Sequence, residues 1–502
     1  MKTSNIFKIS IFAGLIYVGS SCNLDEDLYG SRFIDTSSTA GAADLNGAYS
    51  SLNDFSDQAN IYALLEHPTD EMLGPTRGTD WDDFGVWRKL HLHTWDPLHD
   101  HVYNAWNFLN RGVFRATQVA SRAADNQIKA EASFLRAFYM FYVVDLYGQA
   151  PFRDPADSPE TLPRVFNRQE ATNFIIQDLK FAEANLTGGS SSRATKEAAQ
   201  FLLAKVYLNK AVYFQDPQNP AGPFTFTPAD MDSVIFYANA VINSNRFQLS
   251  DRYFDNFKWD NTTASRELIF VRENAFGQSQ NANAENRTRM VMHYNTNPSG
   301  WNGFTTLANF YNSFEEGDQR RGGELPGYTD KNGSRVGFLV GPQFRKVTPS
   351  SPVEAVMDRS GRPLIFTPDV DINYATETQG IRAIKYPLNP DNYSQSGNDY
   401  VFFRYADVIL MKAEAILRGG TDPMGQTPVT LVNSIRSIRG ATPLGAVDEA
   451  ALLAERGREL YWEGWRRNDQ IRFGTFNAPV DQRPTASAPT RCVYPIPQRA
   501  ID

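Results

Sequence analysis

The sequence is poor in the residues that build disulfide frameworks, metal centres and nucleic-acid interfaces. Its 502 residues include only two cysteines, Cys22 and Cys492, and neither has the spacing of a metal ligand. Lys and Arg number 49 against 57 Asp and Glu, and the net charge of −8 argues against a phosphate-binding surface. A glycine-rich phosphate loop, a Gly-x-Ser-x-Gly elbow and a Cys/His nucleophile pair are also missing, so no motif of those enzyme classes is present.

Aromatic residues, in contrast, are plentiful. They make up 13% of the chain, with 22 Tyr and 34 Phe. In a helical protein many of them belong to the core, but some remain available for a recognition surface. A chain of this length can bury a large core, and no Pro/Ser-rich linker or charge run divides it. We therefore expect one large domain with long excursions.

The N-terminus has the pattern of a secretion signal. Lys2 and Lys8 precede the apolar run 9–18, which is too short to span a bilayer, and small residues lead from it to Cys22. A cysteine at this place resembles a bacterial lipoprotein box, so residues 1–21 are predicted to be a lipoprotein signal peptide and Cys22 the lipidation site. The alternatives are a plain signal peptide with an incidental cysteine, or a core helix.

Residues 400–417 are the stretch around which the rest of the chain is organised. Apolar residues recur there at three- and four-residue spacing, and Gly419 and Gly420 close the run, which predicts a mostly buried helix. Arg404, Asp407 and Glu414 carry charges into it. Buried charges need partners, and residues 432–439 and 455–467 offer arginines and carboxylates. The sequence therefore predicts that these three segments pack together as one unit.

The same segments carry a resemblance to a known family. The chain reads Arg-Tyr-Ala-Asp-Val-Ile-Leu-Met-Lys-Ala-Glu-Ala from Arg404, then Val-Asn-x-Ile-Arg from Val432. It continues with Glu-Arg-x-Arg-Glu-Leu-x-x-Glu-Gly-x-Arg-Arg-x-Asp-x-Ile-Arg-Phe-Gly from Glu455. This ordered set is similar to the SusD/RagB family of Bacteroidetes. Its members are surface lipoproteins that capture nutrients, mostly glycans, for a TonB-dependent outer-membrane transporter.

The resemblance implies a mainly α fold, with a tetratricopeptide-like α-α superhelix as scaffold, long irregular loops and a few short strands. Residues 22–502 would form a single domain of this type. Its helical scaffold would span about 41–245 and 400–474, and its loop-rich, ligand-binding excursions about 66–100 and 250–400. The protein would be lipid-anchored and exposed on the outer membrane as the lid of a SusC-like transporter. The acidic residues 23–27 resemble the family's surface-export signal, although a charged tether would look the same.

Periodicity places further helices along the first half of the chain. The segment 130–147 is nearly continuous in its helical pattern and stops at Gly148 and Pro151. Other helices are expected at about 170–185, 193–214 and 230–242. Their alternation of large and small residues is typical of tetratricopeptide-like stacking, although loops of unequal length interrupt it.

A turn-rich loop at 74–85 is the first candidate for ligand binding. It combines an arginine, carboxylates and an aromatic residue, and an indole face can stack on the apolar face of a sugar while polar groups meet its hydroxyls. The alternative is an ordered loop whose tryptophans fill the core. From this region the predicted glycan-binding residues are Asp70, Arg77, Trp81 and Trp87.

A second candidate lies at 293–304, which is rich in Asn, Gly and aromatic residues. Ligand sites often lie on such excursions from a rigid scaffold. The predicted glycan contacts here are Asn295, Trp301 and Asn302; the alternative is a buried loop anchor.

Cofactors are not expected. The pairs His91/His93 and His99/His101 lack the converging ligands of a zinc site, and hydrogen-bonded structural histidines are the favoured interpretation. Residues 391–399 have oxygen ligands enough for a structural calcium ion, but not the spacing of a known calcium loop.

Three functions remain open. A glycan-binding protein is favoured, with a RagB-like peptide-binding protein as the alternative. A glycosidase is disfavoured. Glu455, Glu459 and Glu463 would share one face of a helix that also carries arginines, which lower a carboxyl pKa, whereas a general acid needs a raised one. We predict a structural ion-pair network and no enzyme.

Overall fold

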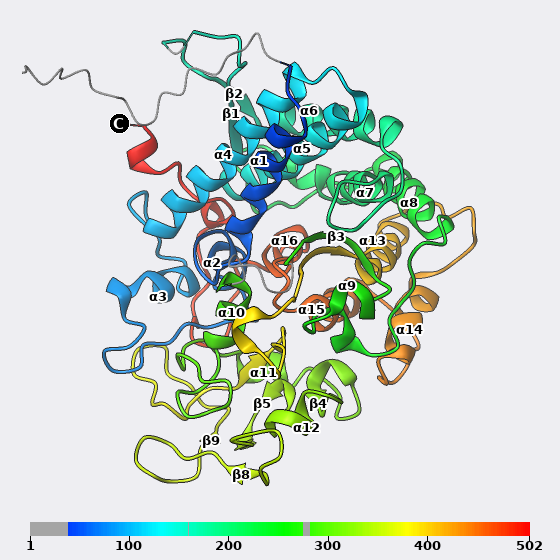
Figure 1. Ribbon diagram of the computed structural model, residues 1–502. Coiled ribbons are helices and arrows are strands. Elements are labelled where there is room, and N and C mark those ends of the chain that lie inside the picture. Colours follow the sequence, from blue (N-terminus) through cyan, green and yellow to red (C-terminus); the bar gives the residue numbers. More distant parts are fainter. Residues whose placement is uncertain (1–38, 159, 275–281, 502) are drawn as a thin grey trace, which may run out of the picture. The chain divides into compact units, whose positions relative to one another are not determined.

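Long helices form the scaffold: from α4 to α8 each packs on the next, and α13 packs on α8, α14 and α15 (Figure 1). The computed structural model describes residues 39–158, 160–274 and 282–501, so the predicted signal peptide and Cys22 lie outside the described residues. The contacts run from α4 to α8 in order, then from α8 to α13 and on to α14 and α15. The bounds are α4 Asp100–Arg122, α5 Asn126–Tyr147, α6 Arg168–Asn185, α7 Lys196–Tyr213, α8 Pro228–Asn243, α13 Tyr405–Leu417, α14 Pro428–Ile438 and α15 Glu449–Leu460.

Local sequence sets the ends of these helices. Side chains of Asp125, Asn167, Thr195 and Thr227 each accept a hydrogen bond from a backbone N–H of the first turn. Gly148, at φ 75°, ends α5 in the left-handed conformation that glycine adopts without strain. The mainly α fold with long loops and short strands is confirmed.

The segment 400–404 is a strand, so the prediction of one helix over 400–417 was wrong at its start. Strand β11 (Tyr400–Arg404) pairs antiparallel with β3 (Leu268–Arg272), and α13 begins only at Tyr405. Both faces of β11 are buried: Phe402 meets Phe138 on one side and Phe403 stacks on Phe201 on the other. A strand buried on both faces gives a continuous apolar run, which periodicity cannot distinguish from a buried helix.

The expectation of one helix face for Glu455, Glu459 and Glu463 was also wrong. Helix α15 ends at Leu460, and Glu463 lies in the turn before α16 (Arg466–Arg472). Trp462 and Gly464 have positive φ angles of 58° and 83°, which interrupt helical geometry.

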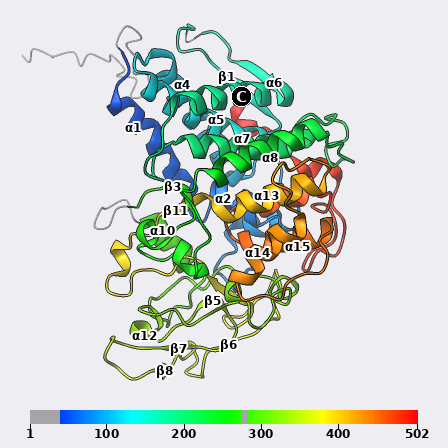
Figure 2. The ribbon, with the colours of Figure 1, turned by 90° about the vertical axis from the view of Figure 1, so that its right-hand side faces the viewer.

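The rest of the chain forms short elements in long loops, of which α12 and β5–β8 are labelled in the lower part of Figure 2. Before α4 lie α1 Ala42–Ser50, η1 Ser51–Phe55, α2 Asn60–Glu66, η2 Asp83–Gly85 and α3 Val86–His91. Between α5 and α6 the strands β1 Gln149–Phe152 and β2 Arg164–Asn167 pair with each other. After α8 come η3 Tyr253–Asn256, α9 Asn261–Ala264, α10 Ala282–Arg289, α11 Ala308–Tyr311, η4 Gln319–Arg321 and α12 Thr329–Asn332, and later η5 Tyr393–Gln395, η6 Pro489–Cys492 and η7 Gln498–Ala500.

The small sheets of this region are β10–β5–β4, β6–β9 and β7–β8. Their strands are β4 Gly322–Gly323, β5 Val336–Leu339, β6 Gly341–Pro342, β7 Phe344–Arg345, β8 Glu354–Ala355, β9 Ile365–Phe366 and β10 Arg382–Ile384.

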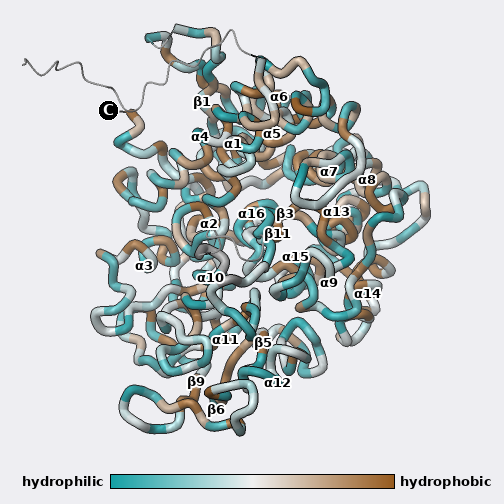
Figure 3. The backbone as a smooth tube through the Cα atoms, viewed as in Figure 1, coloured by the Kyte–Doolittle hydropathy of each residue, from teal (hydrophilic) through white to brown (hydrophobic). Residues whose placement is uncertain are grey.

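The scaffold helices α7 and α8 carry both hydrophobic and hydrophilic residues, as the colours of Figure 3 show. One continuous hydrophobic core joins the helices to β3 and β11. Among the described residues no helix is long and apolar enough to cross a bilayer.

Candidate functional site

Two tryptophans from distant segments meet at the surface. The Trp81 indole nitrogen donates a hydrogen bond to the Trp301 backbone oxygen at 2.9 Å, and the ring centroids lie 6.4 Å apart. Trp301 is 36% exposed and Trp81 is partly buried. Gly303 allows this approach, because a Cβ there would overlap the Trp81 ring. We call Trp81 and Trp301 the tryptophan platform.

The platform rests on a buried aromatic layer. Trp81 packs on Phe304 and Trp87, with ring centroids 4.7 and 5.8 Å away. Trp87 is only 4% exposed, and its indole nitrogen donates to the Asp83 carboxylate at 2.6 Å. The structure therefore gives Trp87 a supporting position under Trp81, not one at the surface.

Arg77 joins the loops behind the platform. Its guanidinium donates to the Gly303 carbonyl at 3.1 Å and to the Thr376 carbonyl, and the side chain is buried. Burial without a carboxylate partner lowers the pKa of Arg77 to about 9. Asn302 is also buried: its amide donates to the Glu377 carbonyl and accepts from Arg382. Both predicted contacts are therefore occupied within the protein.

Polar side chains from several segments near the platform residues bond to one another, and we call Asp80, Tyr294, Asn295 and Arg359 the polar rim; of these the sequence had singled out only Asn295. The Tyr294 hydroxyl donates to Asp80 at 2.5 Å, and the Arg359 guanidinium lies 4.7 Å above the Tyr294 ring. Arg359 is paired with Glu377 at 3.0 Å. The partly buried Asn295 donates its side-chain amide to the Met357 carbonyl. This rim brings together segments around residues 80, 294 and 359–377, and no local motif marks it.

Asp70, the remaining predicted glycan contact, bonds to residues of α16 and not to the residues of the tryptophan platform. Arg466 binds both of its carboxylate oxygens at 2.7 Å, and Gln470 donates to one of them. Burial would raise the pKa of Asp70, but Arg466 holds it below its usual value. The pair lines a hollow of about 250 Å³ together with Leu307, Asn309, Phe310, Pro479 and Asp481.

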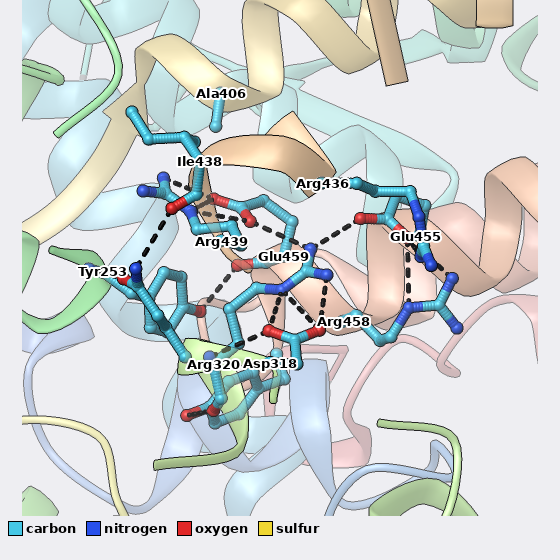
Figure 4. Close-up of polar contacts among 12 residues, drawn as sticks. Tyr253, Asp318, Arg320, Ala406, Arg436, Ile438, Arg439, Glu455, Arg458 and Glu459 are labelled. Carbon is cyan, nitrogen blue, oxygen red and sulfur yellow. Dashed lines mark hydrogen bonds and ion pairs between the residues drawn. The ribbon is translucent and has the colours of Figure 1, made fainter. Parts of the chain in front are cut away.

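The glutamates of α15 form the predicted ion-pair network (Figure 4). Glu459 is fully buried and receives Arg404, Arg439 and Arg320 at 2.6, 3.0 and 3.1 Å. Burial would raise the pKa of Glu459, but the three guanidinium groups hold it well below its usual range. A carboxyl group in that state cannot act as a general acid, so this cluster is structural.

The two histidine pairs, His91/His93 and His99/His101, are hydrogen-bonded structural residues, as predicted. Both ring nitrogens of His91 contact the backbone oxygens of His67 and Asp481, and His93 contacts the Pro68 carbonyl and the Ser487 hydroxyl. In the described part of the chain, no three His, Cys, Asp or Glu side chains are grouped to hold a metal.

The candidate calcium segment uses its carboxylates internally. Asp391 pairs with Lys331, and Asp399 accepts hydrogen bonds from the Asn274 backbone and from Thr262. Calcium binding there stays a prediction.

The known proteins to which this chain is similar all belong to one family. A profile described as the SusD family matches residues 266–502, and one described as starch-binding, associating with outer membrane, matches residues 56–208. The starch-binding protein SusD of Bacteroides thetaiotaomicron is 25% identical over 479 residues, 87% of this chain and 80% of that protein.

Solved structures of the same kind share the fold. A SusD superfamily protein from Parabacteroides distasonis superposes with a TM-score of 0.67 at 19% identity, covering 91% of this chain and 95% of that one. The surface glycan-binding protein A from Bacteroides fluxus gives a TM-score of 0.64 at 19% identity, with coverages of 92% and 96%.

Proposed function

The chain belongs to the SusD family, and from this premise we propose that it is a glycan-binding protein of the outer-membrane surface. It captures oligosaccharides from degraded polysaccharides and does not cleave them. Relatives named as starch-binding and glycan-binding proteins support this proposal.

The observation that carries the proposal is the tryptophan platform. Trp301, which is partly exposed, and Trp81, whose indole is bonded to the Trp301 backbone, offer an apolar surface. Sugar rings present an apolar face of C–H groups to such a surface. The rim around Tyr294, Asp80 and Arg359 supplies donors and acceptors for the ring hydroxyls. Stacking with few hydrogen bonds favours modest affinity, which suits a ligand that must be passed on.

We place the protein on the cell exterior, anchored by acyl chains on Cys22, as the lid of a SusC-like TonB-dependent transporter. The family's association with the outer membrane supports this placement. The fractionation test compares the full chain with Cys22→Ala. The parent chain is expected in the outer membrane and open to protease added to whole cells, and the variant is expected to be released from the membrane.

The binding test uses soluble protein that starts at Asn23. It is titrated with soluble starch, laminarin and xyloglucan, and separately with a mixture of peptides. Binding of a polysaccharide without release of reducing sugar supports the proposal. Binding of peptides alone would replace it with a peptide-capture function, and release of sugar would make the protein a hydrolase.

A further inference from the structure

Phe84 is displayed to solvent by a strained turn. Its side chain is 94% exposed, and it lies in the 3₁₀ turn η2 with φ 55°. Trp81 and Asp83, in the same four-residue stretch, also have positive φ angles, 59° and 38°. Residues other than glycine adopt this conformation at a cost, and such strain clusters at ligand-binding segments.

The turn is held firmly in this shape. Asp83 accepts from the buried Trp87 indole at 2.6 Å, and Asp82 is bound to Arg88 at 2.8 Å. The carboxylates of Asp82 and Asp83 are thus bound to neighbouring side chains, while Phe84 projects into solvent and makes no ring contact with another aromatic side chain of the described residues.

Tyr374 is displayed in a similar way from a neighbouring loop. It is 83% exposed, and its backbone N–H donates to Asp371 at 3.1 Å. The next residue, Ala375, donates to the Thr76 carbonyl at 2.9 Å, and Thr76 donates to the Ile372 carbonyl at 3.0 Å. The loop that bears Tyr374 is therefore attached to the segment that leads into Trp81.

Both residues are linked to the tryptophan platform, Phe84 by a short stretch of backbone and Tyr374 through hydrogen bonds. Phe84 is three residues from Trp81, which limits their Cα separation to about 11 Å. Tyr374 is two residues from Thr376, whose carbonyl is bound by the same Arg77 that binds the Gly303 carbonyl beside the platform.

We propose that Phe84 and Tyr374 extend the tryptophan platform into a longer sugar-binding surface, which makes the protein prefer a polysaccharide chain to a short oligosaccharide. The inference rests on the proposed function. Single exposed apolar residues are common on proteins. Two exposed aromatic rings on adjoining, hydrogen-bonded loops, one of them on strained backbone, extend the apolar surface that successive sugar units can contact.

The test compares chain lengths. Soluble protein from Asn23 is titrated with soluble starch, laminarin and xyloglucan, and with the shortest oligosaccharides of each. Phe84→Ala and Tyr374→Ala are expected to lower affinity for the polysaccharide roughly three- to tenfold each and to leave affinity for the short oligosaccharide unchanged. Trp301→Ala is expected to lower both affinities.

Phe236→Ala is the matched control, because Phe236 is also highly exposed but lies on α8. Equal losses for long and short ligands, or no loss in either loop variant, would overturn the inference while the proposed function stands. A parent protein that binds no polysaccharide would overturn both. Thermal unfolding checks that each variant is folded. We expect all the loop variants to fold, because the side chains that they truncate are exposed.

Discussion

The indole of Trp81 is bonded to the backbone of Trp301, 220 residues further along the chain. This bond joins the two loops that the sequence marked separately as ligand-binding candidates. It also holds the Trp81 ring beside the Trp301 backbone, so the two residues are together before any ligand arrives. Pre-organised rings lose little conformational entropy on binding.

Trp87 and Trp301 are predicted to differ sharply in their effect on stability. Trp87→Ala removes a buried ring and its hydrogen bond to Asp83, and should lower the free energy of unfolding by about 3–5 kcal/mol. Trp301→Ala removes a partly exposed ring and should lower the free energy of unfolding by less than about 1.5 kcal/mol. Urea unfolding of both variants measures the difference. Equal destabilisation would contradict the assignment of Trp87 to the support layer and Trp301 to the surface.

Gly303 is predicted to be required for the platform. A Cβ there would lie 2.8 Å from the Met290 carbonyl oxygen and closer still to the Trp81 indole. Gly303→Ala should therefore displace Trp81, lower the unfolding free energy by about 1–3 kcal/mol and weaken glycan binding. Gly78→Ala is the control: its Cβ meets open space, but φ is +68°, so it reports the cost of backbone strain alone. A Gly303 variant with normal binding would contradict this account.

Glu459 is predicted to be essential for stability. Glu459→Gln keeps the volume but leaves three buried arginines short of a charge partner, and should cost about 3–5 kcal/mol. Glu354→Gln removes an exposed partner of Arg345 and should cost under about 1 kcal/mol. Thermal and urea unfolding compare the two. A small effect at Glu459 would mean that its arginines find other partners.

The buried carboxyl group of Glu66 leads to a prediction about how the free energy of unfolding depends on pH. It is fully buried, and burial raises its pKa to about 7, while Gly464 donates a backbone hydrogen bond to it at 2.6 Å. A folded-state pKa above the unfolded value favours folding of the protonated form. Its contribution, on the order of 3 kcal/mol, is thus complete below about pH 4.5 and is lost as the pH rises to about 7.

Glu66→Gln should remove this loss of stability with rising pH, because glutamine does not ionise. The free energy of unfolding, measured by urea titration from pH 4.5 to 7.5, should fall less steeply in the variant than in the parent. The pKa of Glu71, also raised by burial, leaves part of the slope in both proteins. Parallel pH profiles would contradict the raised pKa of Glu66.

The helices were predictable because their signals are local. Capping side chains, a terminating glycine and three- to four-residue spacing lie within each segment, as in α5. Strand β11 was not predictable, because its extended form depends on β3, more than a hundred residues away, and its buried apolar run fits a helix equally well.

Of the candidate site, only the two tryptophans of the platform were predictable from the sequence. Trp81 and Trp301 stand out by residue type in loop-rich segments. The Tyr294–Asp80 bond spans 214 residues, and the pairing of Arg359 with Glu377 depends on how a long loop folds back. Nor could sequence tell a surface tryptophan from Trp87, because burial is set by the layers packed on either side.

Calorimetric titration of the soluble protein with soluble starch, laminarin and xyloglucan, beside Trp301→Ala and Phe236→Ala, tests the central claim most directly. We predict that one polysaccharide binds, that Trp301→Ala loses at least tenfold in affinity while staying folded, and that Phe236→Ala binds like the parent. Unchanged binding in Trp301→Ala, or no binding to any polysaccharide, would contradict a glycan-capture function at the tryptophan platform.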